Sequence, residues 1–375
     1  MRQILTTHVG SLPRGSELTP LLLARDQGKP YDAATLERLV QAAVEDAVEK
    51  QEAAGVSIVS DGELGKVGYA TYIKERLSGF GGNVARKPAL DLAPLPELRR
   101  KLALIMGEQE FVRASCVGPV RLRNLDPCRD DIHRFSRALE GRSVRGFLNA
   151  ASPGLITAFQ PNAYYPSHEK YLADLVSAMR PEYCAIAASD MQLQLDCPDL
   201  AMARHTGYQD LSEEEFLQVA AANVEALNAA TSDIAPEKMR MHLCWGNYEG
   251  PHDCDIPLER VLDIVLRARP ATILFEAANA RHEHEWKVWA EATIPEDKVL
   301  APGLIDTRSN CLEHPELIAQ RLERFAGIVG VGRVIASTDC GFGTFAGYGK
   351  IDPAVTWKKL RALRAGADIA AARLS

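Results

Sequence analysis

Short apolar runs alternate with amphipathic helical stretches along most of the chain. KMRMHLCWGN (238–247) is followed by the helical pattern LERVLDIVLRA (258–268), and the apolar run PATILFEAAN (270–279) comes next. The first half repeats this order less regularly. Strands that alternate with amphipathic helices predict a parallel sheet. Eight strands are expected, beginning near residues 3, 56, 146, 191, 239, 271, 299 and 333.

Eight such units in one chain predict an α/β fold, a (β/α)8 TIM barrel that spans residues 1–375 as a single catalytic domain. A doubly wound sheet is the alternative. Residues 64–145 interrupt the alternation, because they contain an extra strand-like run, FVRASCVGPVRLRN, and a proline-rich piece, KPALDLAPLPELRRK. We expect this segment to be an insertion over the top of the barrel, after strand 2.

Composition narrows the class of protein. With 46% hydrophobic and 25% charged residues the chain is an ordinary globular protein, and its net charge of -7 argues against binding to nucleic acid or to an anionic membrane. No apolar stretch is long enough to span a bilayer, and the N-terminus lacks a signal-peptide core, so a cytoplasmic location is expected. The 8 cysteines are scattered, which in a reducing compartment predicts free thiols or metal ligands.

Residue types that bind zinc stand at three expected strand ends, where a barrel carries its active site. His242 and Cys244 are two residues apart and therefore point to one face of a strand. Glu276 follows the run ATILF, and Cys340 follows VIASTD. A lone Cys or His at such a place is usually part of the core, but three strand ends that each deliver a ligand predict a zinc site.

Seven motifs along the chain carry a family resemblance. The sequence resembles the catalytic barrel of cobalamin-independent methionine synthase, above all its short single-barrel members, and is similar to the related epoxyalkane:coenzyme M transferases. The resemblance implies a barrel of the methionine synthase/uroporphyrinogen decarboxylase type. The motifs are TTHVGSLPR, SDGELGK, LQLDCPDL, HLCWGN, LFEAANARH, PGLIDTRSN and STDCGFG, which occur in this order between residues 6 and 343.

The resemblance also implies roles for individual residues. The zinc ligands fall on His242, Cys244, Glu276 and Cys340. Gly10 and Ser11 are implied to bind the carboxylate of homocysteine, and Glu63 and Asp196 its ammonium group. Less favoured interpretations stay open: Glu63 and Asp196 are also compatible with ion pairs at loop ends, and Gly10-Ser11 with a simple turn before Pro13.

The ligand set favours thiol chemistry over hydrolysis. A free thiol with a pKa near ~8.5 is a poor nucleophile, whereas binding to zinc deprotonates it. Two thiolates and one carboxylate give the zinc site a formal charge of about −1. An electron-rich zinc of this kind leaves a bound thiolate nucleophilic, and Glu276 is a plausible ligand to be exchanged for the incoming thiol.

One motif departs from the family. Methionine synthases have an acid/base His in D-x-H-S, whereas this chain has Asp306-Thr307-Arg308-Ser309. Arginine does not donate a proton at neutral pH but binds or stabilises anions. Asp306 and Arg308 are therefore the catalytic candidates, and a folate donor is in doubt.

Two other motifs are less informative. GFGTFAG (341–347) resembles a dinucleotide-binding loop, but too few residues follow it for that fingerprint. The run HEHEW (282–286) places His282 with Glu285 or Trp286 on one helix face. A second metal there is not favoured, given the better set next to it.

The leading hypothesis is a zinc-dependent thiol alkyltransferase that methylates homocysteine to methionine through a zinc-bound thiolate. The first alternative is the addition of coenzyme M or a similar thiol to an epoxide. A cofactor-free decarboxylase and a non-catalytic zinc-binding protein are less favoured. The implied partners are a small-molecule thiol and an alkyl donor, and the chain is a possible homo-oligomer.

Overall fold

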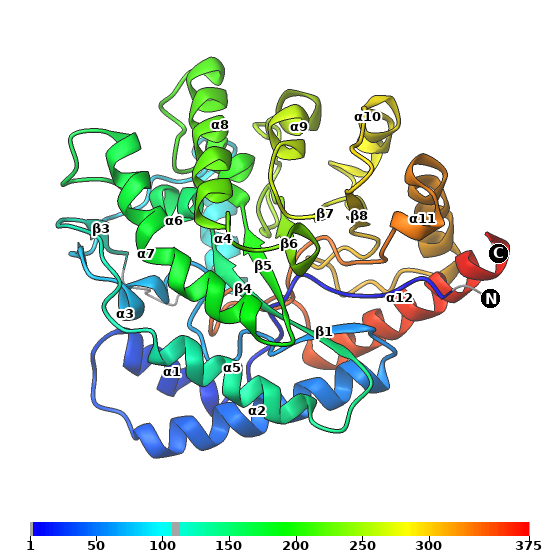
Figure 1. The fold of residues 1–375 in the computed structure, drawn as a ribbon, viewed down its shortest axis with the longest axis horizontal. Coiled ribbons are helices and arrows are strands. Elements are labelled where there is room, and N and C mark those ends of the chain that lie inside the picture. The colour runs from blue at the N-terminus through cyan, green and yellow to red at the C-terminus, as the bar shows by residue number, and fades with distance from the viewer. Residues whose placement is uncertain (1–2, 107–112, 375) are drawn as a thin grey trace.

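A parallel sheet of six strands forms the centre of the computed structural model, which describes residues 3–106 and 113–374. The strands are neighbours in the order in which they follow along the chain (Figure 1). Each of these strand pairs is parallel, so every connection crosses back over the outside of the sheet. The strands are β1 (Ile58–Ser60), β4 (Arg145–Ala151), β5 (Gln192–Asp196), β6 (Met239–His242), β7 (Thr272–Phe275) and β8 (Val299–Pro302).

Two extended segments close the sheet into a barrel. Residues 5–7 lie between β1 and residues 334–337: the backbone oxygen of Thr6 accepts hydrogen bonds from the start of β1, and Thr6 forms a parallel bridge with Ala336. Residues 334–337 continue the circle, since they bridge to Leu300 on β8. The predicted TIM-barrel-like fold is confirmed. The strands expected near residues 3 and 333 are present as single bridges rather than as full ladders.

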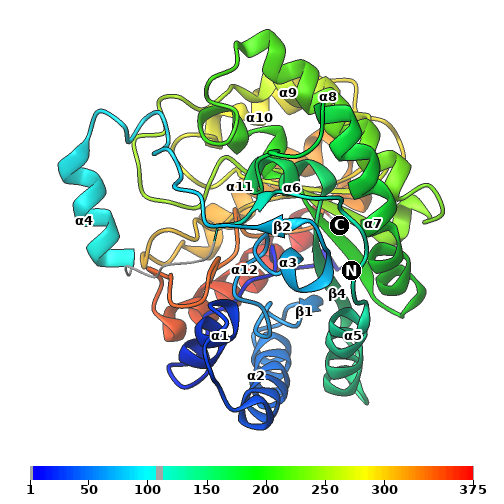
Figure 2. The ribbon, with the colours of Figure 1, turned by 90° about the vertical axis from the view of Figure 1, so that its left-hand side faces the viewer.

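Helices surround the barrel on the outside (Figures 1 and 2). In α2 (Ala33–Ala53) Asp32 caps the first turn, and Val40, Val44 and Val48 recur at helical spacing on the buried side. The other covering helices are α1 (Leu18–Asp26), α6 (Pro153–Phe159), α7 (His168–Ala188), α8 (Glu213–Ala230), α9 (Leu258–Leu266), α10 (Trp286–Glu291), α11 (Pro315–Val329) and α12 (Pro353–Arg373). Short 3-10 turns are η1 (Pro198–Leu200), η2 (Met202–His205), η3 (Pro236–Lys238), η4 (Glu283–Glu285) and η5 (Val331–Arg333).

The long connection between β1 and β4 contains α3 (Ile73–Arg76), β2 (Phe80–Gly81), α4 (Pro96–Met106), β3 (Ser115–Cys116) and α5 (Asp126–Leu139). Of these, α5 packs against α2 and α7 in the outer layer, whereas α4 stands away from the body of the barrel (Figure 2). Arg76 ties the connection down, because its guanidinium pairs with Asp131 on α5 at 2.5 Å and with Glu182 on α7 at 2.8 Å. Whether residues 64–145 form one inserted unit stays a prediction.

A layer of polar side chains fills the barrel interior below the mouth. Arg240 is buried on β6, stacks on the ring of Phe147 at 3.9 Å and donates hydrogen bonds to Thr7 and to the backbone oxygen of His8. Burial lowers the pKa of Arg240 to about 9, although the charge of Asp196 opposes this shift. This polar layer lies directly below the candidate site.

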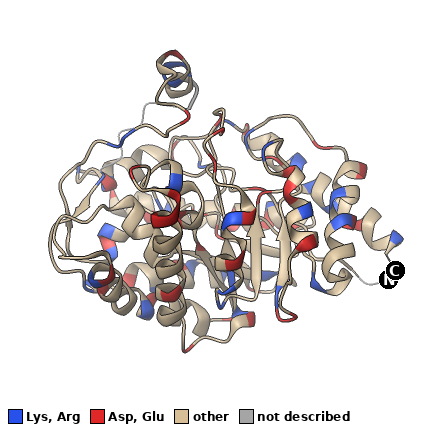
Figure 3. Cartoon of the chain, turned by 90° about the horizontal axis from the view of Figure 1, so that it is seen from above, with Lys and Arg blue, Asp and Glu red and all other residues tan. Residues whose placement is uncertain are grey.

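The outer surface carries interspersed charges of both signs (Figure 3). Among the described residues, no helix combines the length and the apolar character that crossing a membrane requires.

Candidate metal centre

Strand register brings the predicted zinc ligands to one level at the C-terminal mouth of the barrel. Asp196 on β5 is paired with His242 on β6, and His242 is paired with Leu274 on β7. Cys244 and Glu276 follow two residues after His242 and Leu274, just beyond the ends of β6 and β7. Since side chains alternate along a strand, both continue the inward-facing rows that their strands begin.

Three of the four predicted ligands converge. The ligand atoms of His242, Cys244 and Cys340 lie within 4.8 Å of one another, and all three side chains are buried. The two sulfur atoms are 3.8 Å apart and both cysteines are free. Residues 334–337 carry Cys340 to this point, directly beside the end of β6.

The electrostatics of this cluster fit a bound cation. The hydrogen bond with Cys340 and burial raise the pKa of the Cys244 thiol, and the N–H of Gly246 donates a hydrogen bond to the same sulfur at 3.2 Å. Burial lowers the pKa of His242, so its ring stays neutral and keeps a lone pair. Two buried thiols and a neutral imidazole are a soft ligand set of the kind that zinc selects.

Glu276 lies beside the cluster with its carboxylate held by other donors. One oxygen accepts the backbone N–H of Trp245 at 2.8 Å, and the other accepts from the side chains of Asn279 and Arg281, both at 2.7 Å. Trp245 directly follows Cys244, so the carboxylate remains next to the three other predicted ligands. The side chain is therefore available as a fourth ligand but is stabilised away from that position.

Two buried carboxylates lie next to the cluster on its other side. Asp196 is 3.8 Å from the Nδ1 atom of His242 and accepts hydrogen bonds from the side chains of Asn149 and Gln194. Burial raises its pKa, and these hydrogen bonds from Asn149 and Gln194 oppose the shift.

The second carboxylate is Glu63, and it lacks a partner. Its Oε2 atom is buried with no hydrogen bond to any described residue. Burial and the charge of Asp196 raise its pKa to about 8, against the opposing charges of Lys66 and Arg14. The residue also has a φ of 54°, a backbone conformation that is strained for glutamate. The mouth of the barrel therefore contains a buried carboxyl oxygen without a partner, next to a second buried carboxyl group.

The segment around Gly10 and Ser11 joins these two parts of the mouth. Gly10 has a φ of 141°, and a side chain there would overlap Asn149. The backbone oxygen of Ser11 accepts the N–H of Phe342 at 2.8 Å, and its hydroxyl is so close to Gly341 that a Cβ there would lie 1.9 Å away. Ser11 therefore faces the loop that carries Cys340.

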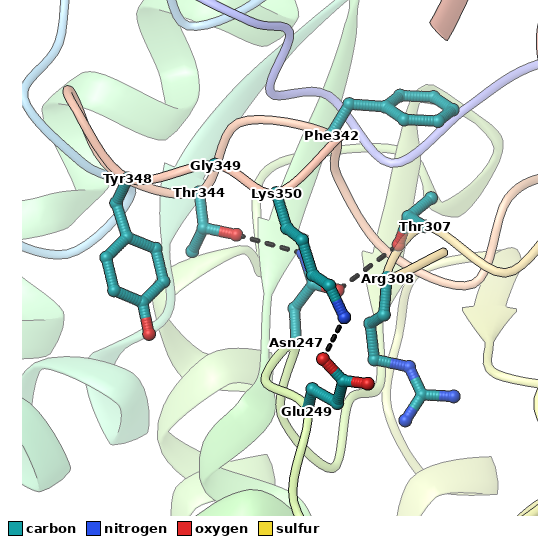
Figure 4. A pocket seen from close by; sticks show the side chains of 9 residues that line it. All are labelled: Asn247, Glu249, Thr307, Arg308, Phe342, Thr344, Tyr348, Gly349 and Lys350. Atoms are coloured by element: carbon teal, nitrogen blue, oxygen red, sulfur yellow. Dashed lines mark hydrogen bonds and ion pairs between the residues drawn. The ribbon is translucent and has the colours of Figure 1, made fainter. Parts of the chain in front are cut away.

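Arg308 and Asp306 form an ion pair with each other. The Nε and Nη2 atoms of Arg308 both donate to Asp306, each at 3.0 Å. Burial alone would lower the pKa of Arg308, but this pairing raises it, so the side chain stays charged. Arg308 lines a pocket beside the ion pair of Lys350 and Glu249, and Asn247 connects the pocket to the loop after β6 (Figure 4).

Asp339 organises the loop after β7, a role that the sequence pattern did not predict. It accepts the backbone N–H groups of Ala277, Ala278 and Asn279, so it fixes the loop that follows Glu276. Burial and the charge of Glu276 raise its pKa to about 7. Its place directly before Cys340 was the available signal.

Comparison with known proteins gives a consistent result, although no family model matches the chain. The chain is 23% identical over 346 residues to a methionine synthase of Sulfurisphaera tokodaii, covering 90% of this chain and 85% of that one. It is 23% identical over 345 residues to a 5-methyltetrahydropteroyltriglutamate–homocysteine methyltransferase of Aeromonas salmonicida, covering 90% of this chain and 40% of that protein.

A third relative performs different chemistry. A 2-hydroxypropyl-CoM lyase of Xanthobacter autotrophicus is 27% identical over 177 residues, covering 40% of this chain and 46% of that protein. Among solved structures, a B12-independent methionine synthase from Shewanella sp. W3-18-1 in complex with selenomethionine superposes with a TM-score of 0.75 at 20% identity, covering 100% of this chain and 99% of that one. The resemblance that the motifs predict is confirmed, and the shared fold is the barrel.

The raised pKa of Glu63 predicts a pH-dependent loss of stability. The folded chain holds a proton on Glu63 up to a pH of about 8, against 4.5 for the free side chain, so its contribution is complete below pH 4.5 and is lost as the pH rises through 8. Glu63→Gln removes this loss. In urea unfolding without substrate, we expect the variant to gain about 4 kcal/mol relative to wild type between pH 5 and 9. Glu17→Gln, at an exposed site, should follow wild type, and parallel profiles for Glu63→Gln would contradict the assignment.

Proposed function

We propose that this protein, similar to cobalamin-independent methionine synthases, transfers a methyl group to homocysteine at a zinc centre held by His242, Cys244 and Cys340, with Glu276 as an exchangeable fourth ligand. The observation that carries the proposal is the convergence of one imidazole and two thiols within 4.8 Å, beside two buried carboxylates. The methionine synthase and homocysteine methyltransferase named above support it.

When bound, zinc supplies a positive charge that lowers the pKa of a substrate thiol and so makes its sulfur nucleophilic at neutral pH. The residues around Glu276 allow the substrate thiol to take a place in the metal's ligand set. Trp245, Asn279 and Arg281 already offer three donors to the carboxylate of Glu276, so the carboxylate has a stabilised place to occupy when the thiol takes its position.

Glu63 and Asp196 suit the ammonium group of an amino-acid thiol. Both are buried, and the charge of Asp196 helps to keep Glu63 protonated in the ligand-free chain. An ammonium group placed between them neutralises the mutual repulsion and supplies the missing partner of Glu63 Oε2. Gly10 and Ser11, between these carboxylates and the Cys340 loop, are the proposed contacts of the substrate carboxylate.

The donor is the part of the reaction in which this chain departs from the methionine synthases. Methyl transfer from a methylated nitrogen needs a proton for that nitrogen, and Arg308 does not release one at neutral pH. The pairing of Arg308 with Asp306 fits a role in orienting the donor at the pocket wall. The partial similarity to the CoM lyase keeps an epoxide donor as the second candidate, whose ring opening generates an anionic oxygen for Arg308 to stabilise.

Removing one thiol should remove one metal ion. Cys340→Ser is expected to lose one zinc equivalent per chain relative to wild type, since a hydroxyl is a poor replacement for a thiolate. Cys311→Ser, which changes an exposed cysteine, is the matched control and should keep all the zinc. Elemental analysis of the purified proteins measures this. Full zinc retention by Cys340→Ser would refute the ligand assignment.

The carboxylate pair should distinguish between thiols. Glu63→Gln or Asp196→Asn is expected to weaken homocysteine binding by about 2–5 kcal/mol, because each removes a buried partner of the ammonium group. Binding of coenzyme M, which has no amine, should change far less. Calorimetric titration of both thiols into zinc-loaded protein gives the comparison. An equal loss for the two thiols would show that the pair has only a structural role.

The role of Arg308 is tested with two donors. Arg308→Ala should lower kcat by about 10²-fold, as removal of a charge that contacts the transition state does, while the KM for the thiol stays nearly constant. The rate should show no histidine-like titration from this position, and Arg308→His should restore the methionine synthase pattern. Methyltetrahydrofolate and an epoxide are compared, with exposed Arg100→Ala as the control. If Arg308→Ala were fully active with every donor that wild type accepts, Arg308 would have no role in the reaction beyond its ion pair with Asp306.

A further inference from the structure

A second group of metal-binding side chains surrounds Asp255, outside the centre described above. The ligand atoms of His205, His252 and Asp255 lie within 4.8 Å of one another. His205 ends η2, in the connection after β5, and the other two lie in the loop after β6. The Nδ1 atoms of His205 and His252 lie 3.3 and 3.0 Å from the same carboxylate oxygen, Oδ1. Both imidazoles are buried.

The outer nitrogens of these two histidines already have acceptors. Nε2 of His252 lies 3.0 Å from the backbone oxygen of Tyr248, which only accepts hydrogen bonds. Nε2 of His205 lies 3.4 Å from the hydroxyl of Tyr248, and that hydroxyl donates its own proton to Asp91 at 2.9 Å. In a neutral imidazole one nitrogen carries the proton and the other a lone pair. With the proton on Nε2 in each ring, both Nδ1 atoms direct lone pairs at the carboxylate of Asp255, where Nδ1 of His252 also lies 3.1 Å from Oδ2.

The other carboxylate oxygen of Asp255, by contrast, faces hydrogen-bond donors. Oδ2 is bound by Arg281 at 2.8 Å and lies 3.1 Å from Nε2 of His282. The other nitrogen of His282 faces Glu285 at 2.7 Å, so a proton on each nitrogen satisfies both carboxylates. By contrast, Nδ1 of His205 is buried with no hydrogen-bond partner among the described residues. Two lone pairs and a carboxylate oxygen that meet in a buried space repel one another unless a cation lies between them.

The backbone of His252, one of the three residues in this cluster, has an unusual conformation. Among the described residues other than glycine, His252 and Glu63 are those with a positive φ, and the φ of His252 is 56°. Backbone strain of this kind persists only where the surrounding structure imposes it, and strained residues are frequent at binding sites. The arrangement of each histidine also matches protein metal sites, in which a ligating imidazole donates its other N–H to an oxygen that fixes the ring.

We propose that His205 Nδ1, His252 Nδ1 and Asp255 Oδ1 bind a second divalent transition-metal ion, of the class that two imidazoles and one carboxylate select, such as zinc. The ion holds the connections after β5 and β6 together. It also fixes Asp255, whose Oδ2 anchors Arg281, and Arg281 in turn binds Glu276 at the first centre. The second ion is thus a structural support for the loops that present Glu276.

The competing account is a second proton on His252, which would then donate Nδ1–H to Asp255. That account leaves His205 Nδ1 without a partner, whereas the metal satisfies both histidines at once. The two accounts differ in metal content, which is directly measurable.

The test uses wild type and three single variants, purified with zinc and then freed of loose metal. Wild type should hold two zinc ions per chain, and Cys340→Ser and His252→Asn should each hold one. Asparagine is chosen because it tolerates a positive φ. His284→Gln, an exposed neighbour of His282, is the control and should keep two. His205→Gln repeats the test if His252→Asn does not fold.

Cobalt substitution assigns each ion to its site independently of activity. The thiolate-to-cobalt charge-transfer band should persist in His252→Asn and vanish in Cys340→Ser, which should still bind one cobalt ion without that band. One zinc ion in wild type that is lost only in Cys340→Ser would overturn the second site and leave the proposed function intact. One zinc ion lost only in His252→Asn would support the second site and refute the zinc ligands of the proposed function. Two zinc ions in His252→Asn would also overturn the second site.

Discussion

The candidate site depends on the pairing of Thr6 with Ala336, which closes the barrel. Gly10 lies four residues after Thr6, and Cys340 lies four residues after Ala336. Parallel segments that pair at one point reach the same height an equal number of residues later. This single register therefore places two ends of the chain, 330 positions apart, side by side at the mouth of the barrel. Without it, the last cysteine would have no histidine or second thiol to meet.

Closure of the barrel also brings several buried carboxyl groups together at its mouth. Glu63, Asp196 and Asp339 are all buried at the mouth, and burial raises the pKa of each. Charges of one sign are stable together in such a place only when cations or many N–H donors compensate them. Asp339 is compensated by backbone N–H groups and Asp196 by side-chain amides. Glu63 keeps an oxygen without a partner, which is why we propose it as the contact for a positively charged substrate group.

Arg281 joins the two side-chain clusters into one structure. It binds Glu276 beside the thiols and Asp255 among the histidines, with N–O distances of 2.7 and 2.8 Å. The ring of Trp245, whose backbone N–H holds Glu276, also packs on His282 with ring centres 4.2 Å apart. Arg281 and Trp245 therefore connect both clusters to the carboxylate of Glu276.

Local periodicity in the sequence determined the barrel and the soft ligand set. The twofold alternation of a strand places His242 and Cys244 on one face, and the ends of parallel strands meet at one mouth, so the pattern predicts that they lie near Cys340. Only the tertiary structure decided which partner each charged group has. Arg308 is bound by the neighbouring carboxylate of Asp306, while His282 of the HEHEW run contacts Asp255 from another loop. Loop side chains carry no periodic signal, because their partners are set by the distance between loops in space rather than along the chain.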